Sequence, residues 1–202
     1  MIEITNEDNM LLMARYPDKY FDLAIVDPPY RDNNQPTKDM RKNGSMQSLE
    51  GRPSKEYFDE LYRVSKNQII WGANNFQLPQ FFGFVVWKKL TISEDFTMSM
   101  AEIASLSEGL GTTSKIFELE PQGKKSDPRI HPTQKPVKLY KWLLDKYAKN
   151  GYKILDTHLG SGSFAIACHD YGFDLIACEL DKDYFEAALK RLKQHQSQTK
   201  LF

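Results

Sequence analysis

Four consecutive residues, Asp27-Pro28-Pro29-Tyr30, have the chemistry to bind and activate an amine. They follow the apolar run 21–26, and two adjacent prolines cannot continue a strand. The Asp27 carboxylate and the Pro28 carbonyl could each accept a hydrogen bond from one exocyclic amine, while the Tyr30 ring offers a flat face to a planar base. Two acceptors would draw the amine lone pair out of conjugation, which predicts attack on a methyl sulfonium. The alternative is a rigid turn capped by Asp27.

A second set of candidate residues forms a glycine turn between an expected strand and an expected helix. Gly160 and Gly162 let the backbone approach a ligand closely, and Glu179 follows Gly162 by 17 residues, where a carboxylate could accept both ribose hydroxyls. These features predict an adenosine-type cofactor. Position 165 is alanine rather than the third glycine of a dinucleotide fingerprint, and Asp156 favours a cationic group such as the methionine end of S-adenosylmethionine (SAM). A simple tight turn is the alternative.

The elements that must position these residues alternate between strand-like and helix-like segments, which is typical of an α/β fold with a parallel sheet flanked by helices. Strands are expected at 21–26, 68–71, 82–87, 100–106, 153–156 and 174–179. Helices are expected from Ser54, from Pro136, over 164–170 and over 184–193. Residues 31–53 are interpreted as a long mobile loop, a lid or groove reader, and residues 107–130 as a connector or small hairpin.

The length and composition exclude several classes of protein. The 202 residues, 41% of them hydrophobic, predict a single domain over 1–202. Lys+Arg and Asp+Glu both number 27, so a strongly basic nucleic-acid coat is excluded. Two cysteines make neither a disulfide framework nor a four-cysteine zinc site, which predicts a reducing cytosol. The N-terminus has no signal-peptide pattern, and no apolar run reaches the roughly 18 residues of a membrane span.

With the Asp-Pro-Pro-Tyr motif ahead of the glycine turn, the chain resembles the SAM-dependent DNA amino-methyltransferases (the DNA methylase N-4/N-6 family). It is most similar to adenine-specific members of the permuted β group, which have this motif order. Three further motifs carry the resemblance over most of the chain: Asn67–Phe76, His131–Leu139 (HPTQKPVKL) and Ile154–Ser163 (ILDTHLGSGS). The resemblance implies a Rossmann-like, SAM-dependent methyltransferase fold, circularly permuted, with a mostly parallel sheet and helices on both faces.

The resemblance also implies a role for each matching residue. Asp27, Pro28, Pro29 and Tyr30 would form the catalytic turn. The expected cofactor-binding residues are Asp8, Asp27, His131, Thr133, Gln134, Lys135, Asp156, His158, Gly160, Ser161, Gly162, Ser163 and Glu179. Among them, Thr133, Gln134 and Lys135 would lie near the SAM carboxylate. Glu179 would bind the ribose, and Asp8 would lie near the adenine.

Two departures from the family pattern stand out. The glycine turn of the family usually begins Asp-Pro-Phe, whereas here it reads Asp156-Thr157-His158, so His158 is expected to replace the phenylalanine. One histidine without Cys or His partners does not predict a metal site. Larger members insert a target-recognition domain before the HPTQKP motif, but here only 107–130 is available. Recognition is therefore expected to be minimal, shared with another subunit, or lost.

The charges gather near the two motifs in spite of the zero total. Residues 31–55 carry a net charge of +3 and residues 115–141 a net charge of +4, which predicts contacts with phosphates. Ordinary solvated loops are the alternative. The candidate DNA-binding residues are Arg31, Lys38, Arg41, Lys42 and Arg52.

The resulting hypothesis is a site-specific DNA methyltransferase that converts a flipped adenine to N6-methyladenine and releases S-adenosylhomocysteine. It would work without a metal, as a homodimer or with a recognition subunit, in the cytoplasm of a bacterial or phage-infected cell. It could be an orphan enzyme or part of a restriction-modification system. The alternatives are a cytosine-N4, RNA or glutamine methyltransferase, or a non-catalytic nucleic-acid or cofactor-binding subunit.

Overall fold

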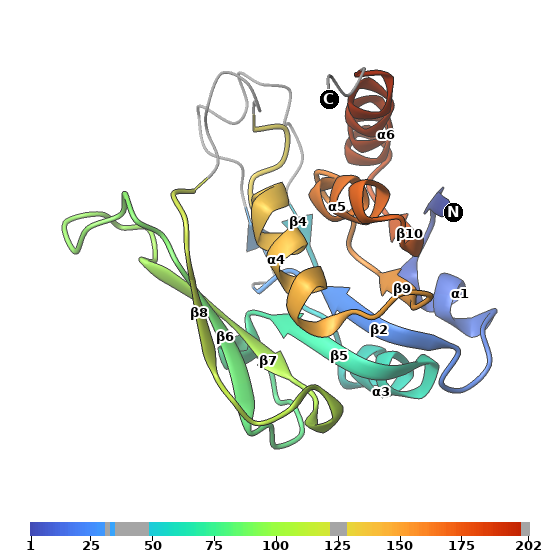
Figure 1. Cartoon of the computed structure of the whole chain (residues 1–202), viewed down its shortest axis with the longest axis horizontal. Coiled ribbons are helices and arrows are strands. Elements are labelled where there is room, and N and C mark those ends of the chain that lie inside the picture. The colour runs from blue at the N-terminus through green and yellow to red at the C-terminus, as the bar shows by residue number, and fades with distance from the viewer. Residues whose placement is uncertain (31–32, 35–48, 122–128, 199–202) are drawn as a thin grey trace.

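A computed structural model of the chain describes residues 1–30, 33–34, 49–121 and 129–198. Its centre is an eight-stranded sheet with the order β1-β10-β9-β2-β5-β7-β6-β8 (Figure 1). The strands of this sheet are β1 (Ile2–Asn6), β2 (Phe21–Val26), β5 (Ser65–Trp71), β6 (Gly83–Lys88), β7 (Ala101–Leu106), β8 (Lys115–Glu118), β9 (Lys153–Asp156) and β10 (Asp174–Glu179). The two-residue strands β3 (Asn33–Asn34) and β4 (Leu49–Glu50) pair with each other.

The sheet is mostly parallel, and its order places early and late parts of the chain side by side. Strands β1, β10, β9, β2 and β5 are parallel neighbours, while β7 runs antiparallel between β5 and β6. Strand β2, which precedes Asp27, therefore lies next to β9, which precedes the glycine turn. This arrangement confirms the α/β prediction, and the strand before Asp27 comes earlier in the chain than the strand before the glycine turn.

Helices cover both faces of the parallel part of the sheet. The helices are α1 (Asn9–Ala14), α3 (Lys55–Val64), α4 (Val137–Tyr147), α5 (Ser163–Tyr171) and α6 (Lys182–Ser197), and the short 3-10 helices are η1 (Ala73–Asn75) and η2 (Glu108–Leu110). Side chains of β2 alternate between the two faces: Leu23 and Ile25 pack with α4, α5 and α6, whereas Ala24 and Val26 pack with α1 and α3. Apolar side chains on both faces of β2 thus contribute to both core layers, as in buried parallel sheets.

Hydrogen bonds to capping side chains determine where helices α1 and α6 begin. The Asp8 carboxylate accepts hydrogen bonds from the first turn of α1, and Asp181 does the same for α6. Helix α6 therefore begins before the expected start at Tyr184, and it also continues beyond Lys193. Ser54 stands at the start of α3 as expected, but its side chain makes no capping hydrogen bond there.

Residues 107–130 differ from the expected connector or hairpin. They contain β8, which pairs parallel to β6 and forms the last strand of the sheet. Its Phe117 packs against Trp142 of α4, with ring centroids 5.2 Å apart. The pairing with β6 and this apolar contact hold β8 at the edge of the sheet.

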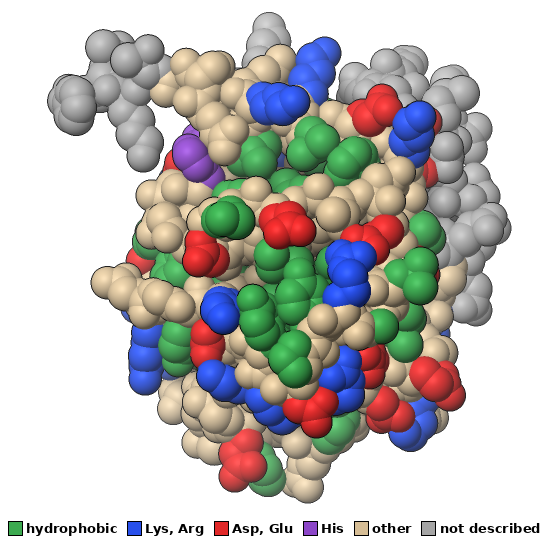
Figure 2. Space-filling view, turned by 90° about the vertical axis from the view of Figure 1, so that its right-hand side faces the viewer, with side chains coloured by type: hydrophobic (Ala, Val, Ile, Leu, Met, Phe, Trp, Pro, Cys, Tyr) green, Lys and Arg blue, Asp and Glu red, His purple; other side chains and the backbone are tan. Residues whose placement is uncertain are grey.

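The surface mixes charges of both signs. Figure 2 shows Lys and Arg side chains interspersed with Asp and Glu over one face of the molecule, with hydrophobic groups between them. In the described part of the chain, no helix combines the length and the apolar character needed to cross a lipid bilayer.

Candidate active site

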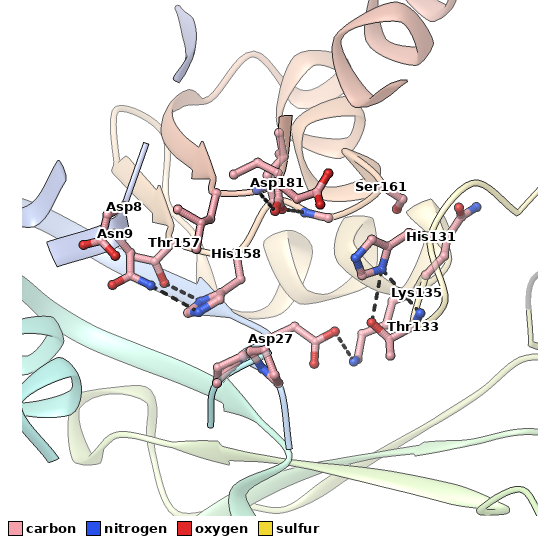
Figure 3. A pocket seen from close by; sticks show the side chains of 18 of the residues that line it. Asp8, Asn9, Asp27, His131, Thr133, Lys135, Thr157, His158, Ser161 and Asp181 are labelled. Carbon is pink, nitrogen blue, oxygen red and sulfur yellow. Dashed lines mark hydrogen bonds and ion pairs between the residues drawn. The ribbon is translucent and has the colours of Figure 1, made fainter. Parts of the chain in front are cut away.

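An open cavity of about 890 Å³ lies at the carboxyl ends of β2, β9 and β10. Its walls come from four segments that are far apart in the sequence: 7–9, 27–30, 131–135 and 157–161 (Figure 3). Residues 179–182, Gly51 and Tyr140 complete the lining. Parallel strands all end at the same edge of a sheet, so the two motifs meet at the place where such folds bind ligands.

The Asp-Pro-Pro-Tyr turn forms one wall of this cavity. The Asp27 carboxylate accepts a hydrogen bond from the Tyr30 hydroxyl at 2.7 Å, and its other oxygen lies 2.5 Å from the Lys135 ammonium. Burial raises the pKa of Asp27, although the positive charge of Lys135 opposes this effect. The Asp27 carboxylate is thus a desolvated acceptor with a cationic neighbour.

The Tyr30 ring is packed tightly against the backbone of Gly72. A Cβ atom at position 72 would overlap the ring, and Gly72 also has a positive φ of 70°, which L side chains rarely adopt. The ring of Phe76 meets Tyr30 edge-on, with centroids 6.1 Å apart. The motif Asn67–Phe76 therefore supports the catalytic turn from below.

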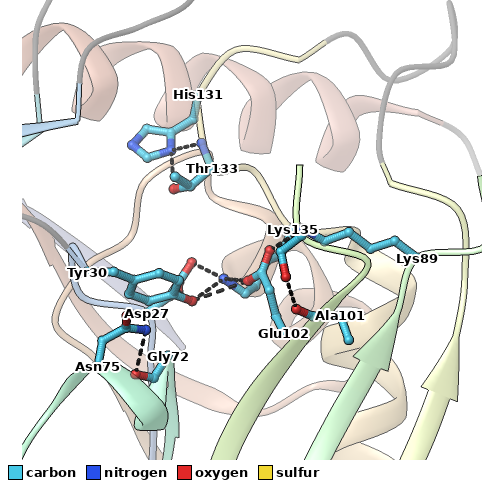
Figure 4. Close-up of polar contacts among 11 residues, drawn as sticks. Asp27, Tyr30, Gly72, Asn75, Lys89, Ala101, Glu102, His131, Thr133 and Lys135 are labelled. Carbon is cyan, nitrogen blue, oxygen red and sulfur yellow. Dashed lines mark hydrogen bonds and ion pairs between the residues drawn. The ribbon is translucent and has the colours of Figure 1, made fainter. Parts of the chain in front are cut away.

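Lys135 lines the cavity and connects it to the antiparallel part of the sheet. Its side chain is 1% exposed, and its ammonium lies between Asp27 and Glu102 (Figure 4). Glu102 in turn contacts Lys89 at 2.6 Å. Burial would raise the pKa of Glu102, but Lys135 and Lys89 together lower it to about 2. Sequence reasoning missed Glu102 and Lys89; charged residues in or beside apolar strands were the available signal.

The glycine turn and Glu179 form the opposite wall. Glu179 accepts hydrogen bonds from the backbone N–H of Gly160 at 2.8 Å and of Asp181 at 3.1 Å. Arg191 of α6 donates to the Ser161 carbonyl at 2.8 Å and to the Ser163 hydroxyl at 2.9 Å. The turn is therefore fixed from behind by a side chain that the sequence analysis did not identify.

Histidines at two places line the cavity in a neutral form. Burial lowers the pKa of His131 and of His158 to about 3. The His158 ring lies 2.9 Å from the Thr157 hydroxyl and 3.3 Å from the Asn9 amide. Among the described residues there is no cluster of three or more His, Cys, Asp or Glu side chains suited to a metal.

Most of the expected site residues line the cavity, and three do not. Those that line it are Asp8, Asp27, Pro28, Pro29, Tyr30, His131, Thr133, Gln134, Lys135, His158, Gly160, Ser161 and Glu179. Asp156, Gly162 and Ser163 lie behind this lining. Gly162 caps α5 with a positive φ of 72°, and Asp156 accepts a hydrogen bond from the His158 N–H at 3.0 Å. Their positions suit support of the turn.

Of the expected DNA contacts, only Arg52 falls in the described part of the chain. Arg31, Lys38, Arg41 and Lys42 lie outside the described residues, as does most of the expected loop 31–53. The Arg52 guanidinium donates to the Tyr30 carbonyl at 3.0 and 3.3 Å, so it contacts the catalytic turn.

The buried Asp156 predicts a pH-dependent stability. Burial raises its pKa to about 8 from 3.8, so between these values the folded protein keeps a proton that the unfolded chain has released. The free energy of unfolding must then fall as the pH rises through this range. Asp156→Asn removes this titration. We expect the gain in its melting temperature over that of the wild type, both measured without ligand, to be roughly 5 °C larger at pH 9 than at pH 5. Equal gains at both pH values, or the same trend in the exposed control Asp95→Asn, would contradict this expectation.

Comparison with known proteins finds similarity to DNA methylases. The family model for DNA methylase, N6_N4_Mtase, matches residues 6–190. The protein named "Putative methylase YubD" of Escherichia coli (strain K12) is 27% identical over 211 aligned positions, which cover 92% of this chain and 87% of that protein.

Two solved structures share the fold. The crystal structure of the M1.HpyAVI-SAM complex has a TM-score of 0.65 and 18% identity, covering 95% of this chain and 99% of that chain. PvuII DNA methyltransferase, described as cytosine-N4-specific, has a TM-score of 0.67 and 10% identity, covering 100% of this chain and 88% of that chain. Since the family match spans the catalytic turn, the HPTQKP motif and the glycine turn, the chain belongs to the N6/N4 DNA methylase family.

Proposed function

We propose that this protein transfers a methyl group from SAM to the exocyclic 6-amino group of adenine in DNA. The observation that carries the proposal is the position of Asp27 and Pro28 in the same cavity as the glycine turn and Glu179. An amine bound at the first pair would face a methyl donor bound at the second. The aspartate in the first motif position favours adenine, because family members that act on the cytosine amine more often carry serine there.

The cavity suits the cofactor chemically. The Gln134 side-chain nitrogen is buried and has no hydrogen-bond partner among the described residues, although its oxygen accepts from the Ile130 N–H at 3.0 Å. An unpaired buried donor is costly, and a ligand carboxylate would satisfy it. Across the cavity, Glu179 retains lone pairs for ribose hydroxyls beyond its two backbone bonds. Asp8, at the start of α1, borders the same end of the cavity.

The unpaired donor predicts which part of the cofactor Gln134 recognises. Gln134→Glu keeps the oxygen that accepts from Ile130 but replaces the donor with a second acceptor. We expect the affinity for S-adenosylhomocysteine to fall about 10-fold or more, while that for 5′-methylthioadenosine, which lacks the carboxylate, stays unchanged. Calorimetric titration of both ligands checks this, with the exposed Gln77→Glu as control. Equal losses for the two ligands would remove Gln134 from the carboxylate site.

The residues of this chain account for the activation of the target amine. When bound, SAM supplies an electrophilic methyl group on a sulfonium. Asp27 and the Pro28 carbonyl accept the two amine hydrogens, which localises the nitrogen lone pair, and the Asp27 carboxylate can receive the proton that the methylated amine releases. Among the described residues, each Asp27 oxygen has one partner and retains a lone pair for the amine. The adenine must leave the base stack to enter this cavity.

A cytosine-N4 activity is the second candidate, because the PvuII enzyme described as cytosine-N4-specific shares the fold. The same two acceptors would bind either exocyclic amine. The two bases differ in ring size, so the pocket beside Tyr30 would select between them.

The deciding experiment treats unmethylated genomic DNA with the purified chain and SAM. Mass spectrometry of the hydrolysed DNA separates N6-methyladenine from N4-methylcytosine, and sequencing maps the modified positions. N6-methyladenine at a recurrent motif is the expected result. N4-methylcytosine would establish the second candidate. Neither base, from protein that still binds S-adenosylhomocysteine, would contradict both. RNA and a glutamine-containing protein serve as competing substrates in parallel reactions.

A further inference from the structure

Two buried lysines and two half-buried carboxylates form a line from the catalytic turn into the antiparallel end of the sheet (Figure 4). Asp27 contacts Lys135 at 2.5 Å, Lys135 contacts Glu102 at 3.0 Å, and Glu102 contacts Lys89 at 2.6 Å. The line holds two carboxylates and two ammonium groups, and the Arg129 guanidinium also interacts electrostatically with Glu102. Because buried charges are costly unless paired, each member of this line depends on its neighbours.

Glu102 contacts both groups that contact Asp27. Its Oε2 atom lies 3.0 Å from the Lys135 ammonium and 3.2 Å from the Tyr30 hydroxyl oxygen. The one hydrogen of that hydroxyl can be donated to Asp27 at 2.7 Å or to Glu102, and Lys135 donates to the hydroxyl oxygen at 3.2 Å. Lys135 and Tyr30 therefore each lie between the two carboxylates.

The fold gives Glu102 a rigid position for this task. It stands on β7, opposite Trp87 of the neighbouring β6, and Lys89 follows directly after β6. The Lys89 N–H donates to the Met100 carbonyl at 2.8 Å, which ties the two strands together beside Glu102. Residues on paired strands are better fixed than residues on loops.

The Glu102 and Asp27 carboxylates also differ in the direction of their pKa shifts. Lys135 and Lys89 keep the pKa of Glu102 low, whereas burial raises the pKa of Asp27. Two titratable groups whose pKa values are shifted in opposite directions commonly take different roles in a mechanism. Glu102 suits a permanent counter-ion for Lys135, and Asp27 suits the group that exchanges a proton with the substrate.

We propose that Glu102 is a positioning residue for methyl transfer, acting through Lys135 and the Tyr30 hydroxyl to orient the Asp27 carboxylate toward the target amine. This inference rests on the proposed function. Without the Glu102 charge, Lys135 would pair with Asp27 alone and compete with the amine for its oxygens. The Tyr30 hydroxyl would also lose a charged acceptor at 3.2 Å and keep at most a weaker, neutral one.

The test compares Glu102→Gln, which removes the charge at nearly constant shape, with Glu118→Gln. Glu118 forms an exposed ion pair with Lys88 on the adjacent strands, so it is a matched control. For Glu102→Gln we expect kcat to fall roughly 100-fold, as small misplacements of reacting groups can cause, with the affinity for S-adenosylhomocysteine unchanged. Wild-type kcat in Glu102→Gln would overturn the inference.

A pH profile distinguishes positioning from general damage. The Glu102 charge raises the pKa of Asp27, so its removal should move the acid limb of kcat to lower pH. Glu102→Asp retains the charge and should leave that limb near its wild-type position, although its shorter side chain lowers kcat. If Glu102→Gln does not fold, the pH profile of Glu102→Asp is the test. A shift of its acid limb from the wild-type position by as much as one pH unit would contradict the inference.

A structural measurement separates failure of this inference from failure of the proposed function. If wild-type protein methylates neither base in DNA, the proposed function fails. A crystal structure of Glu102→Gln then still tests the positioning role. We expect the Lys135 ammonium to move toward Asp27 and the Tyr30 hydroxyl to rotate. An unchanged arrangement of Asp27, Tyr30 and Lys135 would overturn the inference.

Discussion

Asp27→Ala is expected to lower kcat by about 10³-fold, within the range found for loss of a group that activates a nucleophile. The variant removes one of the two acceptors for the target amine and the group that receives its proton. Folding should survive, because Lys135 keeps Glu102 as a charged partner at 3.0 Å. The affinity for SAM should stay within about 2-fold of wild type, since Asp27 acts mainly on the target base.

Single-turnover methylation measures the chemical step, and calorimetry with S-adenosylhomocysteine measures the cofactor site. Asp59→Ala, on the exposed side of α3, is the control for loss of a carboxylate. Near-native turnover of Asp27→Ala would refute the proposed activation of the amine. Loss of cofactor affinity equal to the loss of turnover would instead place Asp27 in the cofactor site.

Glu179→Ala is expected to weaken binding of S-adenosylhomocysteine by about 100-fold. Hydrogen bonds to a charged group contribute about 1.5–3 kcal/mol each, and two ribose hydroxyls would lose their acceptor. The loss also frees the Gly160 and Asp181 N–H groups that Glu179 binds, which loosens the glycine turn. With saturating cofactor, kcat should be much less affected, because the amine site on β2 is separate.

Glu179→Gln separates these two contributions, because it keeps one oxygen for a backbone N–H while removing the charge. Its affinity should fall between those of the wild-type and Ala proteins. Asp174→Ala, at the other end of the same strand, is the matched control and should bind normally. Unchanged affinity in Glu179→Ala would exclude Glu179 from the cofactor site.

Much of this architecture could be predicted from local sequence alone. The apolar run 21–26 and the strand 174–179 occur as expected, because buried parallel strands need continuous apolar residues. Glycines and prolines marked the turns at 27–30 and 157–162. The strand-end position of both motifs followed from the α/β pattern, since all parallel strands of such a sheet end at one edge.

The partners of individual side chains could not be predicted in this way. The motif around Lys135 was recognised, but nothing in the local sequence indicated that its ammonium lies between Asp27 and Glu102. Asp156 was expected in the cavity, yet it lies behind the lining and supports the His158 backbone. Strand 115–118 owes its place to the contact between Phe117 and Trp142.

The difference has a physical reason. Apolar periodicity, turn residues and caps act between neighbours in the chain, so the sequence contains them directly. An ion pair such as that between Lys135 and Glu102 depends on the register of β7 against β6 and on where the segment before α4 crosses the sheet. The free-energy cost of removing charges from water then determines which charged side chains can be buried together there. The motifs thus identify the family and its chemistry, whereas the packing of distant segments determines which charges surround the reacting group.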